Sequence, residues 1–311
     1  MARILVTGAA GFIGRALCRS LTARGHAILG VTRVPAEQIP EAELRPIGAI
    51  GPQTDWSAHL DHIDIVIHLA NRAHRQLSQG AKLDEAETAA ALLHASAMAG
   101  VHRLVHMSSI RAMGDATPPG RPFRCTDPPR PRDAYGRAKL ATENALQAAA
   151  WATGIELVIL RPPLVYGPGV KANFRMLMRL ASSGMPLPLA GIDNRRSLIF
   201  LDNLVDLATR ASLHPDAVGR VWLMRDAPDL STPELIGALA ASLGRPARLF
   251  TPPRTVFTTL RHLPYLGGFV NRLTLSLQVE DSETRAALDW RPPVSAKIGL
   301  ALTTRAFRAG L

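Results

Sequence analysis

The chain has few cysteines, few aromatic residues and no long apolar run, and each shortage excludes a class of protein. Its 311 residues include two cysteines, Cys18 and Cys125, too few for a disulfide scaffold and without metal-ligand spacing. No apolar run approaches the roughly 20 residues that span a bilayer. The short apolar stretch that begins at Ile4 lacks the layout of a signal peptide. We therefore expect a cytoplasmic protein with no membrane span and no metal site.

Positive charge is in excess, but it is not concentrated. The formal net charge is +11, and 47% of the residues are hydrophobic, which is enough for a full globular core. Basic residues form no run of five or more, and only three Tyr and eight Phe are present. Binding to single-stranded nucleic acid needs basic grooves with interleaved aromatic rings. We therefore expect no nucleic-acid partner and attribute part of the charge to an anionic small-molecule substrate.

The most specific local pattern lies near the N-terminus. Residues 4–6 form an apolar run typical of a parallel strand covered on both faces, and Gly8, Gly11 and Gly14 follow at regular spacing. Such glycines allow a tight turn, a close approach of the backbone to a pyrophosphate, and close packing of helix on strand. The N-terminus of the helix expected over 12–24 attracts the same anion. The pattern predicts a dinucleotide-binding site.

Apolar runs and amphipathic stretches alternate through the first half of the chain. Strands are expected at 27–32, 64–69, 104–108 and 156–160, and helices at 88–100 and 134–153. This alternation predicts an α/β fold with a doubly wound parallel sheet, and proline and glycine become frequent after Pro163. We expect a dinucleotide-binding domain over 1–165, with a return to it at about 195–225 through strands at 197–201 and 220–224, and a smaller substrate-binding lobe from 166–194 and 226–311.

Tyr135 and Lys139 lie one turn apart on the same face of the helix expected at 134–153. An ammonium group near a phenol favours the phenolate, which makes a tyrosine usable as an acid or base near neutral pH. The strand before this helix ends in Ser108-Ser109. Downstream of a dinucleotide turn, this combination predicts a catalytic centre.

With these motifs the chain resembles the extended short-chain dehydrogenase/reductase family, the group of UDP-glucose 4-epimerases and nucleotide-sugar dehydratases. The resemblance covers nearly the whole chain and, besides the glycine turn and the Tyr135/Lys139 pair, is carried by Phe12-Ile13, His68-Leu69-Ala70, Ser108-Ser109, 160–163, 165–169 and Asp202-Asn203. More narrowly, residues 119–123, 187–189, 194–197 and 276–279 are similar to the bacterial branch of UDP-N-acetylquinovosamine dehydrogenases, which are 4-reductases of UDP-4-keto-6-deoxy-hexosamines.

The resemblance implies a role for each matching residue. Tyr135 would exchange a proton with the sugar 4-oxygen, Lys139 would bind the nicotinamide ribose and tune Tyr135, and Ser109 (or, as an alternative, Ser108) would hydrogen-bond the same oxygen. The implied cofactor-binding residues are Gly8, Gly11, Phe12, Ile13, Gly14, Arg33, Leu69, Ala70, Tyr135, Lys139 and Pro162, with Leu69-Ala70 at the adenosine half and Pro162 at the nicotinamide. Asn173, Arg196 and, as a weaker candidate, Arg272 would hold the UDP diphosphate; otherwise Arg195-Arg196 is a solvated turn. The helices at 88–100 and 134–153 pair across a homodimer in many members of the family.

Two positions depart from the family pattern. Glu85 stands where the family usually has Asn, which should weaken a contact that organises the cofactor or a water molecule. The segment Gly48-Ala49-Ile50 lacks the Asp that often contacts adenine, so packing would have to hold the adenine. A cofactor-binding regulatory protein without turnover therefore stays open as an alternative to an enzyme.

Two short segments bear on which cofactor binds and which reaction is catalysed. NAD enzymes place Asp or Glu on the ribose at the end of the second strand, where this chain has Val31-Thr32-Arg33. We therefore expect NADP(H), with NAD(H) possible if Arg33 stacks on adenine instead. Sugar 4,6-dehydration usually requires Asp-Glu directly after the catalytic hydroxyl, where this chain has Ile110-Arg111. The first expectation is reduction of a UDP-4-keto-6-deoxy-hexosamine, the second is UDP-hexose 4-epimerisation, and other hydroxy/keto chemistry is the third.

Overall fold

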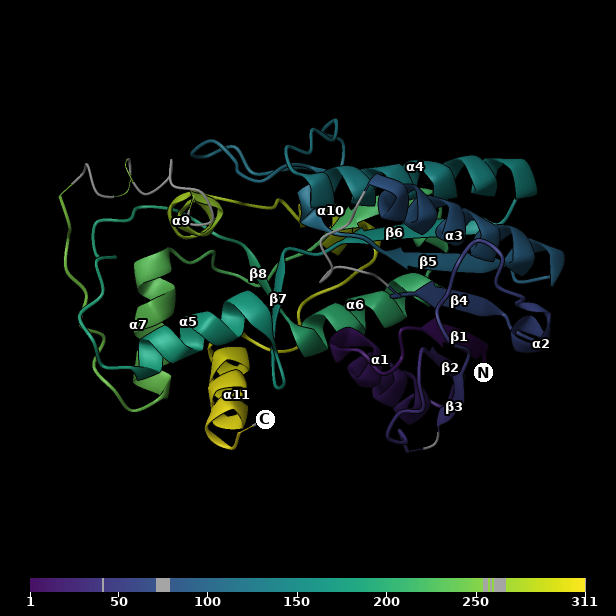
Figure 1. The fold of residues 1–311 in the computed structure, drawn as a ribbon, viewed down its shortest axis with the longest axis horizontal. Helices are drawn as coiled ribbons and strands as arrows, with labels where there is room; N and C mark the ends of the chain where they lie inside the picture. Colours follow the sequence, from purple (N-terminus) through teal and green to yellow (C-terminus); the bar gives the residue numbers. More distant parts are fainter. Residues whose placement is uncertain (41, 71–78, 254–256, 258, 260–266, 311) are drawn as a thin grey trace.

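The computed structural model describes residues 1–40, 42–70, 79–253, 257, 259 and 267–310. Within them, parallel strands form a seven-stranded sheet in the order β3-β2-β1-β4-β5-β6-β9 (Figure 1). The strands are β1 (Arg3–Thr7), β2 (Ala27–Thr32), β3 (Ala42–Pro46), β4 (Ile65–His68), β5 (Arg103–Met107), β6 (Glu156–Arg161) and β9 (Arg220–Leu223). The strand order reverses between β1 and β4, so the doubly wound parallel sheet expected from the sequence is confirmed. Ligands of such sheets bind beyond the carboxyl ends of the strands at that reversal.

Helices cover both faces of this sheet (Figure 1). On one face, α1 (Phe12–Ala23) and α6 (Leu201–Leu213) bury apolar side chains against β1 and its neighbours. On the other, the short α2 (Ser57–Leu60) packs with α3 (Gln79–Met98) and α4 (Ala134–Thr153) over β4, β5 and β6. Burial on both faces explains why the strands read as continuous apolar runs rather than as alternating ones.

A second core lies beside the carboxyl edge of the sheet, on the left in Figure 1. It is formed by α5 (Ala172–Ser182), α7 (Thr232–Ser242), α11 (Ala296–Arg308) and a small parallel sheet of β7 (Leu164–Tyr166) and β8 (Leu198–Phe200). The helix α7 begins at a capping box, in which Ser231 and Glu234 each bond the other's backbone N–H. The remaining helices, α9 (Gly267–Thr274) and α10 (Ser282–Ala287), precede α11 in the chain.

The chain returns to the main sheet through one strand rather than two. β9 pairs with β6, whereas the strand expected at 197–201 forms β8 and pairs with β7 in the separate small sheet. Both segments have the same apolar character, and the edge position beside β6 is taken by β9. Segment 195–197 is tied to the lobe instead, because the N–H of Arg196 donates to Leu230 and that of Ser197 donates to Leu277. In the part of the chain that the structure describes, no helix is long and apolar enough to cross a membrane.

Candidate active site

The turn after β1 has glycines at the positions where the helix and the strand come closest, as a dinucleotide site requires. A Cβ at Gly14 would lie 2.2 Å from the Gly8 carbonyl oxygen, so only glycine lets α1 begin this close to the turn. The N–H of Gly11, the N-cap of α1, donates to that same oxygen at 2.9 Å, and the first turn of α1 carries no acidic side chain. The Thr7 hydroxyl oxygen accepts from the N–H groups of Leu69 and Ala70, both at 3.1 Å. A pyrophosphate at this helix N-terminus would therefore meet a positive dipole end and no repelling carboxylate.

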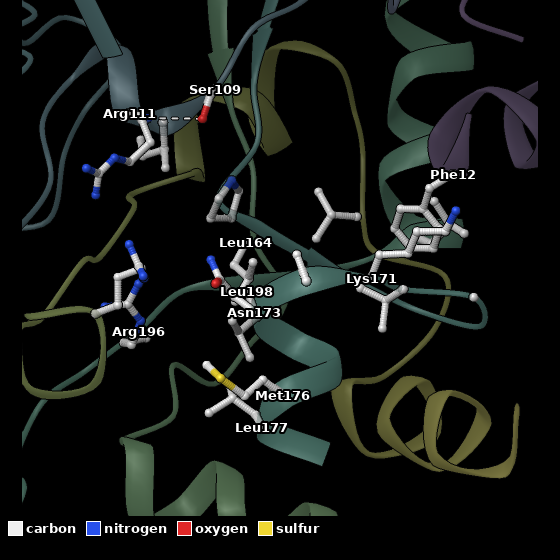
Figure 2. A pocket seen from close by; sticks show the side chains of 18 of the residues that line it. Phe12, Ser109, Arg111, Leu164, Lys171, Asn173, Met176, Leu177, Arg196 and Leu198 are labelled. Atoms are coloured by element: carbon white, nitrogen blue, oxygen red, sulfur yellow. Dashed lines mark hydrogen bonds between the residues drawn. The ribbon is translucent and has the colours of Figure 1, made fainter. Parts of the chain in front are cut away.

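A cleft of about 1310 Å³ lies between the sheet and the smaller lobe. It brings together residues that the sequence analysis proposed for the cofactor, the chemistry and the substrate: Gly11, Phe12, Ser109, Tyr135, Asn173, Arg196 and Arg272. Figure 2 shows Phe12 at one end of this cleft and Arg111 and Arg196 at the other, with Asn173 between them. One cavity is therefore lined both by residues expected to bind the cofactor and by residues expected to bind the substrate diphosphate.

Other proposed residues lie behind the cleft surface rather than on it. Lys139 is 1% exposed, and its Nζ atom lies 5.9 Å from the centre of the Tyr135 ring. Pro162 is buried, and its carbonyl oxygen accepts from the N–H of Ile110, directly after Ser109. Among the residues that line the cleft, none comes from the Gly48-Ala49-Ile50 segment beyond β3, and Arg33 is exposed to solvent after β2.

Of the two serines after β5, Ser109 is the one placed for chemistry. The hydroxyl of Ser108 is buried and donates to Glu143 of α4. The Ser109 side chain lines the cleft, where its oxygen accepts the N–H of Arg111 at 3.2 Å. The Ser109 hydroxyl hydrogen is not used in that bond, so it can be donated to a substrate oxygen.

Tyr135 is brought to this serine by the way α4 begins. Asp133 caps the helix by accepting the N–H of Gly136 at 2.7 Å. A Cβ at Gly136 would lie 2.3 Å from the carbonyl oxygen of Arg111, so a glycine is needed for the helix to approach the turn after Ser109. The close contact holds the start of α4 against the turn after Ser109, and both Tyr135 and Ser109 line the cleft.

Lys139 has a carboxylate partner that family comparison alone did not suggest. Its Nζ atom lies 2.6 Å from Glu85 Oε1 of α3, and the two side chains are 1% and 9% exposed. Glu85, expected to weaken a contact, thus supplies an ion pair to the proposed catalytic lysine. Beneath it, His68 and His106 stack with ring centres 5.5 Å apart. Burial, together with the Lys139 charge, lowers the pKa of His68 to about 3 and holds that of His106 well below 6.5, so both rings are neutral.

A second buried ion pair ties three parts of the site together. Glu143 on α4 accepts a bidentate contact from Arg161 at the end of β6, and the two side chains are 1% and 5% exposed. The same carboxylate accepts from Ser108, and Arg161 also contacts the sulfur of Met113. The network therefore links the strand that precedes Ser109, the helix of Tyr135 and the strand that leads to Pro162.

Three guanidinium groups converge at the substrate end of the cleft. Burial and the nearby charges of Arg111 and Arg272 lower the pKa of Arg196 to about 10, and burial and Arg111 also lower that of Arg272. Arg196 donates to the carbonyl oxygen of Leu275 at 3.0 Å, while Arg111 pairs with Asp133. Arg195 turns away and pairs with Glu234 at 2.6 Å. Sequence reasoning used Arg111 only to exclude dehydration, and its position after Ser109 was the one available signal of a binding role.

Among the described residues, no group of three or more His, Cys, Asp or Glu side chains is placed to hold a metal ion.

Comparison with known proteins gives consistent results over most of the chain. The model of the NAD-dependent epimerase/dehydratase family matches residues 4–223. A UDP-glucose 4-epimerase of Vibrio cholerae is 38% identical, with 98% of this chain and 95% of that protein covered. Among solved structures, MoeE5 in complex with UDP-glucuronic acid and NAD is 25% identical, with a TM-score of 0.79 over 99% of this chain and all of that one. A UDP-glucose 4-epimerase from Thermotoga maritima, at 22% identity and a TM-score of 0.78 over 99% of both chains, shares the fold.

Proposed function

Because the chain belongs to the NAD-dependent epimerase/dehydratase family, we propose that it is a UDP-hexose 4-epimerase. The observation that carries the proposal is the single cleft, which is lined by Ser109 and Tyr135 and, on the lobe side, by Asn173, Arg196 and Arg272. Neither carboxylate of an elimination pair follows Ser109, which argues against dehydration. The 38% identity to a UDP-glucose 4-epimerase supports epimerisation over the reduction that the sequence motifs favoured first.

The residues of the site suggest the following division of labour. Tyr135 accepts the proton of the sugar 4-hydroxyl and returns it after the sugar has turned over, and Ser109 donates a hydrogen bond to the same oxygen. Lys139, next to Tyr135, would hold the nicotinamide ribose, and the glycine turn would hold the pyrophosphate. The bound cofactor supplies the reversible two-electron chemistry at carbon 4. Arg196, Arg272 and Asn173 retain the UDP moiety while the 4-keto sugar rotates within the cleft.

A direct assay separates this proposal from its rivals. An epimerase interconverts UDP-glucose and UDP-galactose, or their N-acetyl or uronate forms, with no net consumption of NAD(P)H. Nuclear magnetic resonance of the sugar anomeric protons measures this conversion, and mass spectrometry of the purified protein measures retained cofactor. Tightly bound NAD⁺ with conversion supports the proposal. Stoichiometric oxidation of NAD(P)H on a UDP-4-keto sugar would replace it with the reductase, and cofactor binding without any turnover would favour the regulatory alternative.

The cofactor preference is a separate proposal that rests on Arg33. No carboxylate stands at the end of β2, and Arg33 there is exposed and able to pair with a 2′-phosphate. NAD is nevertheless the cofactor bound in MoeE5. We expect Arg33→Asp to weaken NADP(H) about tenfold or more relative to NAD(H), by loss of an ion pair and by like-charge repulsion. Titration of both cofactors against both proteins measures this, and an equal change for the two would remove Arg33 from the 2′-phosphate.

The homodimer and the cytoplasmic location stay predictions. Met98 of α3 and Trp151 of α4 are 91% and 93% exposed on the two helices expected to pair. Gel filtration of the parent and of Trp151→Glu measures the oligomeric state, and a monomeric parent would end the dimer proposal.

A further inference from the structure

Glu85 and Lys139 form an ion pair almost out of reach of solvent. Glu85 Oε1 and Lys139 Nζ are 2.6 Å apart, and exposure is 9% for the glutamate side chain and 1% for the lysine. Glu85 lies on α3 and Lys139 on α4, two helices that pack along each other over β4 and β5. The ion pair therefore fixes the position of the Lys139 ammonium group in the core, 5.9 Å from the centre of the Tyr135 ring.

Among the residues whose side chains the structure describes, no other group around Lys139 can replace this carboxylate. His68 of β4 and His106 of β5 lie near it as neutral rings, and Tyr135 on its own helix carries no carboxylate. Glu143, on the same helix, is fully engaged by Arg161 and Ser108. A buried ammonium without a counter-charge is strongly destabilised. Glu85 is therefore the group that makes a charged lysine tolerable at this place.

The ion pair with Glu85 also changes the effect of Lys139 on the ionisation of Tyr135. A lone ammonium close to a phenol favours its ionisation, while an ammonium with a carboxylate at hydrogen-bond distance presents almost no net charge. An amide at position 85, as in the usual family pattern, could accept a hydrogen bond from Lys139, but it would not offset the positive charge of the ammonium group.

We propose that Glu85 is a positioning residue, which holds Lys139 in place and moderates its effect on Tyr135, so that the phenol ionises at a higher pH than a neutral side chain at position 85 would allow. The proposal rests on the roles assigned above to Tyr135 and Lys139. It extends them to a residue that is not among those lining the cleft.

The test compares parent, Glu85→Gln, Glu85→Asp and Glu87→Gln, each loaded with NAD⁺. Glutamine keeps the shape and an acceptor oxygen but loses the charge, aspartate keeps the charge, and Glu87 is an exposed carboxylate on the same helix two residues away. Ultraviolet difference titration of tyrosinate, with the signal of Tyr135→Phe subtracted, follows Tyr135 alone. We expect the Tyr135 curve of Glu85→Gln to move to lower pH by about one unit, that of Glu85→Asp to lie near the parent, and Glu87→Gln to match it. The pH profile of kcat should move with the titration.

Several outcomes would overturn the proposal. One is a Tyr135 curve that is unchanged in Glu85→Gln or moves to higher pH; another is an equal shift in Glu87→Gln. Circular dichroism and cofactor affinity establish whether each variant is folded. If Glu85→Gln is not folded, Glu85→Asp carries the test, because it keeps the carboxylate and changes the length of the side chain. A folded Glu85→Asp with a Tyr135 curve like that of the parent would support the need for the charge, and a displaced curve would contradict it. Because the spectroscopic titration needs no sugar substrate, a parent protein without epimerase activity would refute the proposed function while leaving this result to stand or fall separately.

Discussion

In the part of the chain that the structure describes, two basic side chains on the sheet side of the cleft are paired with carboxylates, whereas Arg196 and Arg272 on the lobe side are not. On the sheet side, Lys139 pairs with Glu85 and Arg161 pairs with Glu143, all within the core. On the lobe side, Arg196 and Arg272 face each other, and among the described residues neither forms an ion pair. The sheet side can therefore keep its geometry without a ligand, whereas the described part of the lobe side has positive charge without a carboxylate partner. Under the proposed function, the paired charges hold the reacting groups in place and the unpaired ones bind the anionic substrate.

The largest expected effect comes from breaking a pair on the sheet side. Glu143→Ala leaves the Arg161 guanidinium buried and uncompensated and removes the acceptor of Ser108, so stability should fall by about 3–5 kcal/mol. The matched control is Glu156→Ala, which breaks the Arg103–Glu156 pair, whose glutamate is 41% exposed and whose arginine also donates to backbone carbonyls. That change should cost about 1 kcal/mol or less. Urea denaturation measures both, and equal losses would contradict the distinction between buried and exposed pairs.

The second-largest effect is expected when the Tyr135 hydroxyl, the proposed proton acceptor and donor, is removed. Tyr135→Phe keeps the ring beside Lys139 but removes the hydroxyl, so the rate should fall about 100-fold or more, the usual scale for a positioned acid or base. Cofactor affinity and melting temperature should stay near those of the parent, because within the described part of the chain Tyr135 forms no structural hydrogen bond such as the one that the Tyr166 hydroxyl donates to Asp226. Steady-state kinetics with the best UDP-hexose measure the effect. Retention of most of the activity would remove Tyr135 from the reaction.

The lobe side is tested by the unpaired arginine. Arg196→Ala removes a charge-assisted contact to a diphosphate worth roughly 1.5–3 kcal/mol, so the KM for a UDP-sugar should rise about tenfold to a hundredfold. Arg195→Ala is the matched control, because that side chain pairs with Glu234 outside the cleft. Cofactor affinity should not change in either variant.

Competition by UDP reports on the same site without turnover. UDP should inhibit the parent and Arg195→Ala alike and Arg196→Ala much less. Equal inhibition of all three would leave Arg196 as a solvated turn residue, and no inhibition of any would argue against a nucleotide-sugar substrate.

The effect that is smallest at neutral pH concerns the neutral histidines near Lys139. Burial holds the pKa of His68 at about 3 and that of His106 well below 6.5, so below pH 6.5 the unfolded chain binds protons that the folded protein does not. Their contribution is complete above that pH and is lost as the pH falls, by up to about 1.4 kcal/mol per pH unit for each ring. His106→Phe should reduce this acid sensitivity, and His102→Gln, at an exposed position, should not. Urea denaturation at several pH values between neutrality and mild acid measures the slopes; identical slopes for all three proteins would contradict the assignment.

The sequence predicted the fold well because the signals for it are local. The glycine turn, the apolar strands and α4, whose bounds match the expectation, each depend on neighbouring residues. The family assignment follows from the same segments. Local signals were weaker at β3, which was not expected, and at β8, whose apolar pattern did not reveal which sheet it joins. A strand of three residues has too little pattern to specify its neighbour.

Among the candidate site residues, those that belong to short motifs could be predicted from the sequence, and those that depend on contacts between distant segments could not. Ser109 and Tyr135 were identified from a few adjacent letters, while the choice between Ser108 and Ser109 depends on Glu143, 35 residues away from Ser108. The pairing of Glu85 with Lys139 joins residues 54 apart. Arg111 became a candidate for substrate binding only when the folded chain placed it near Arg196.

By itself the sequence determined the doubly wound sheet, the dinucleotide turn and the Tyr135/Lys139 pair, because hydrophobic periodicity, glycine spacing and helical spacing act over a few residues. Only the tertiary structure decided which charges are neutralised and which remain free for an anion. Lys139 and Arg196 are both basic residues in the printed sequence, but one is packed between two helices against Glu85 and the other lies at the cleft beside like charges. Electrostatic energy depends on distance and burial in space, and neither can be obtained from separation along the chain.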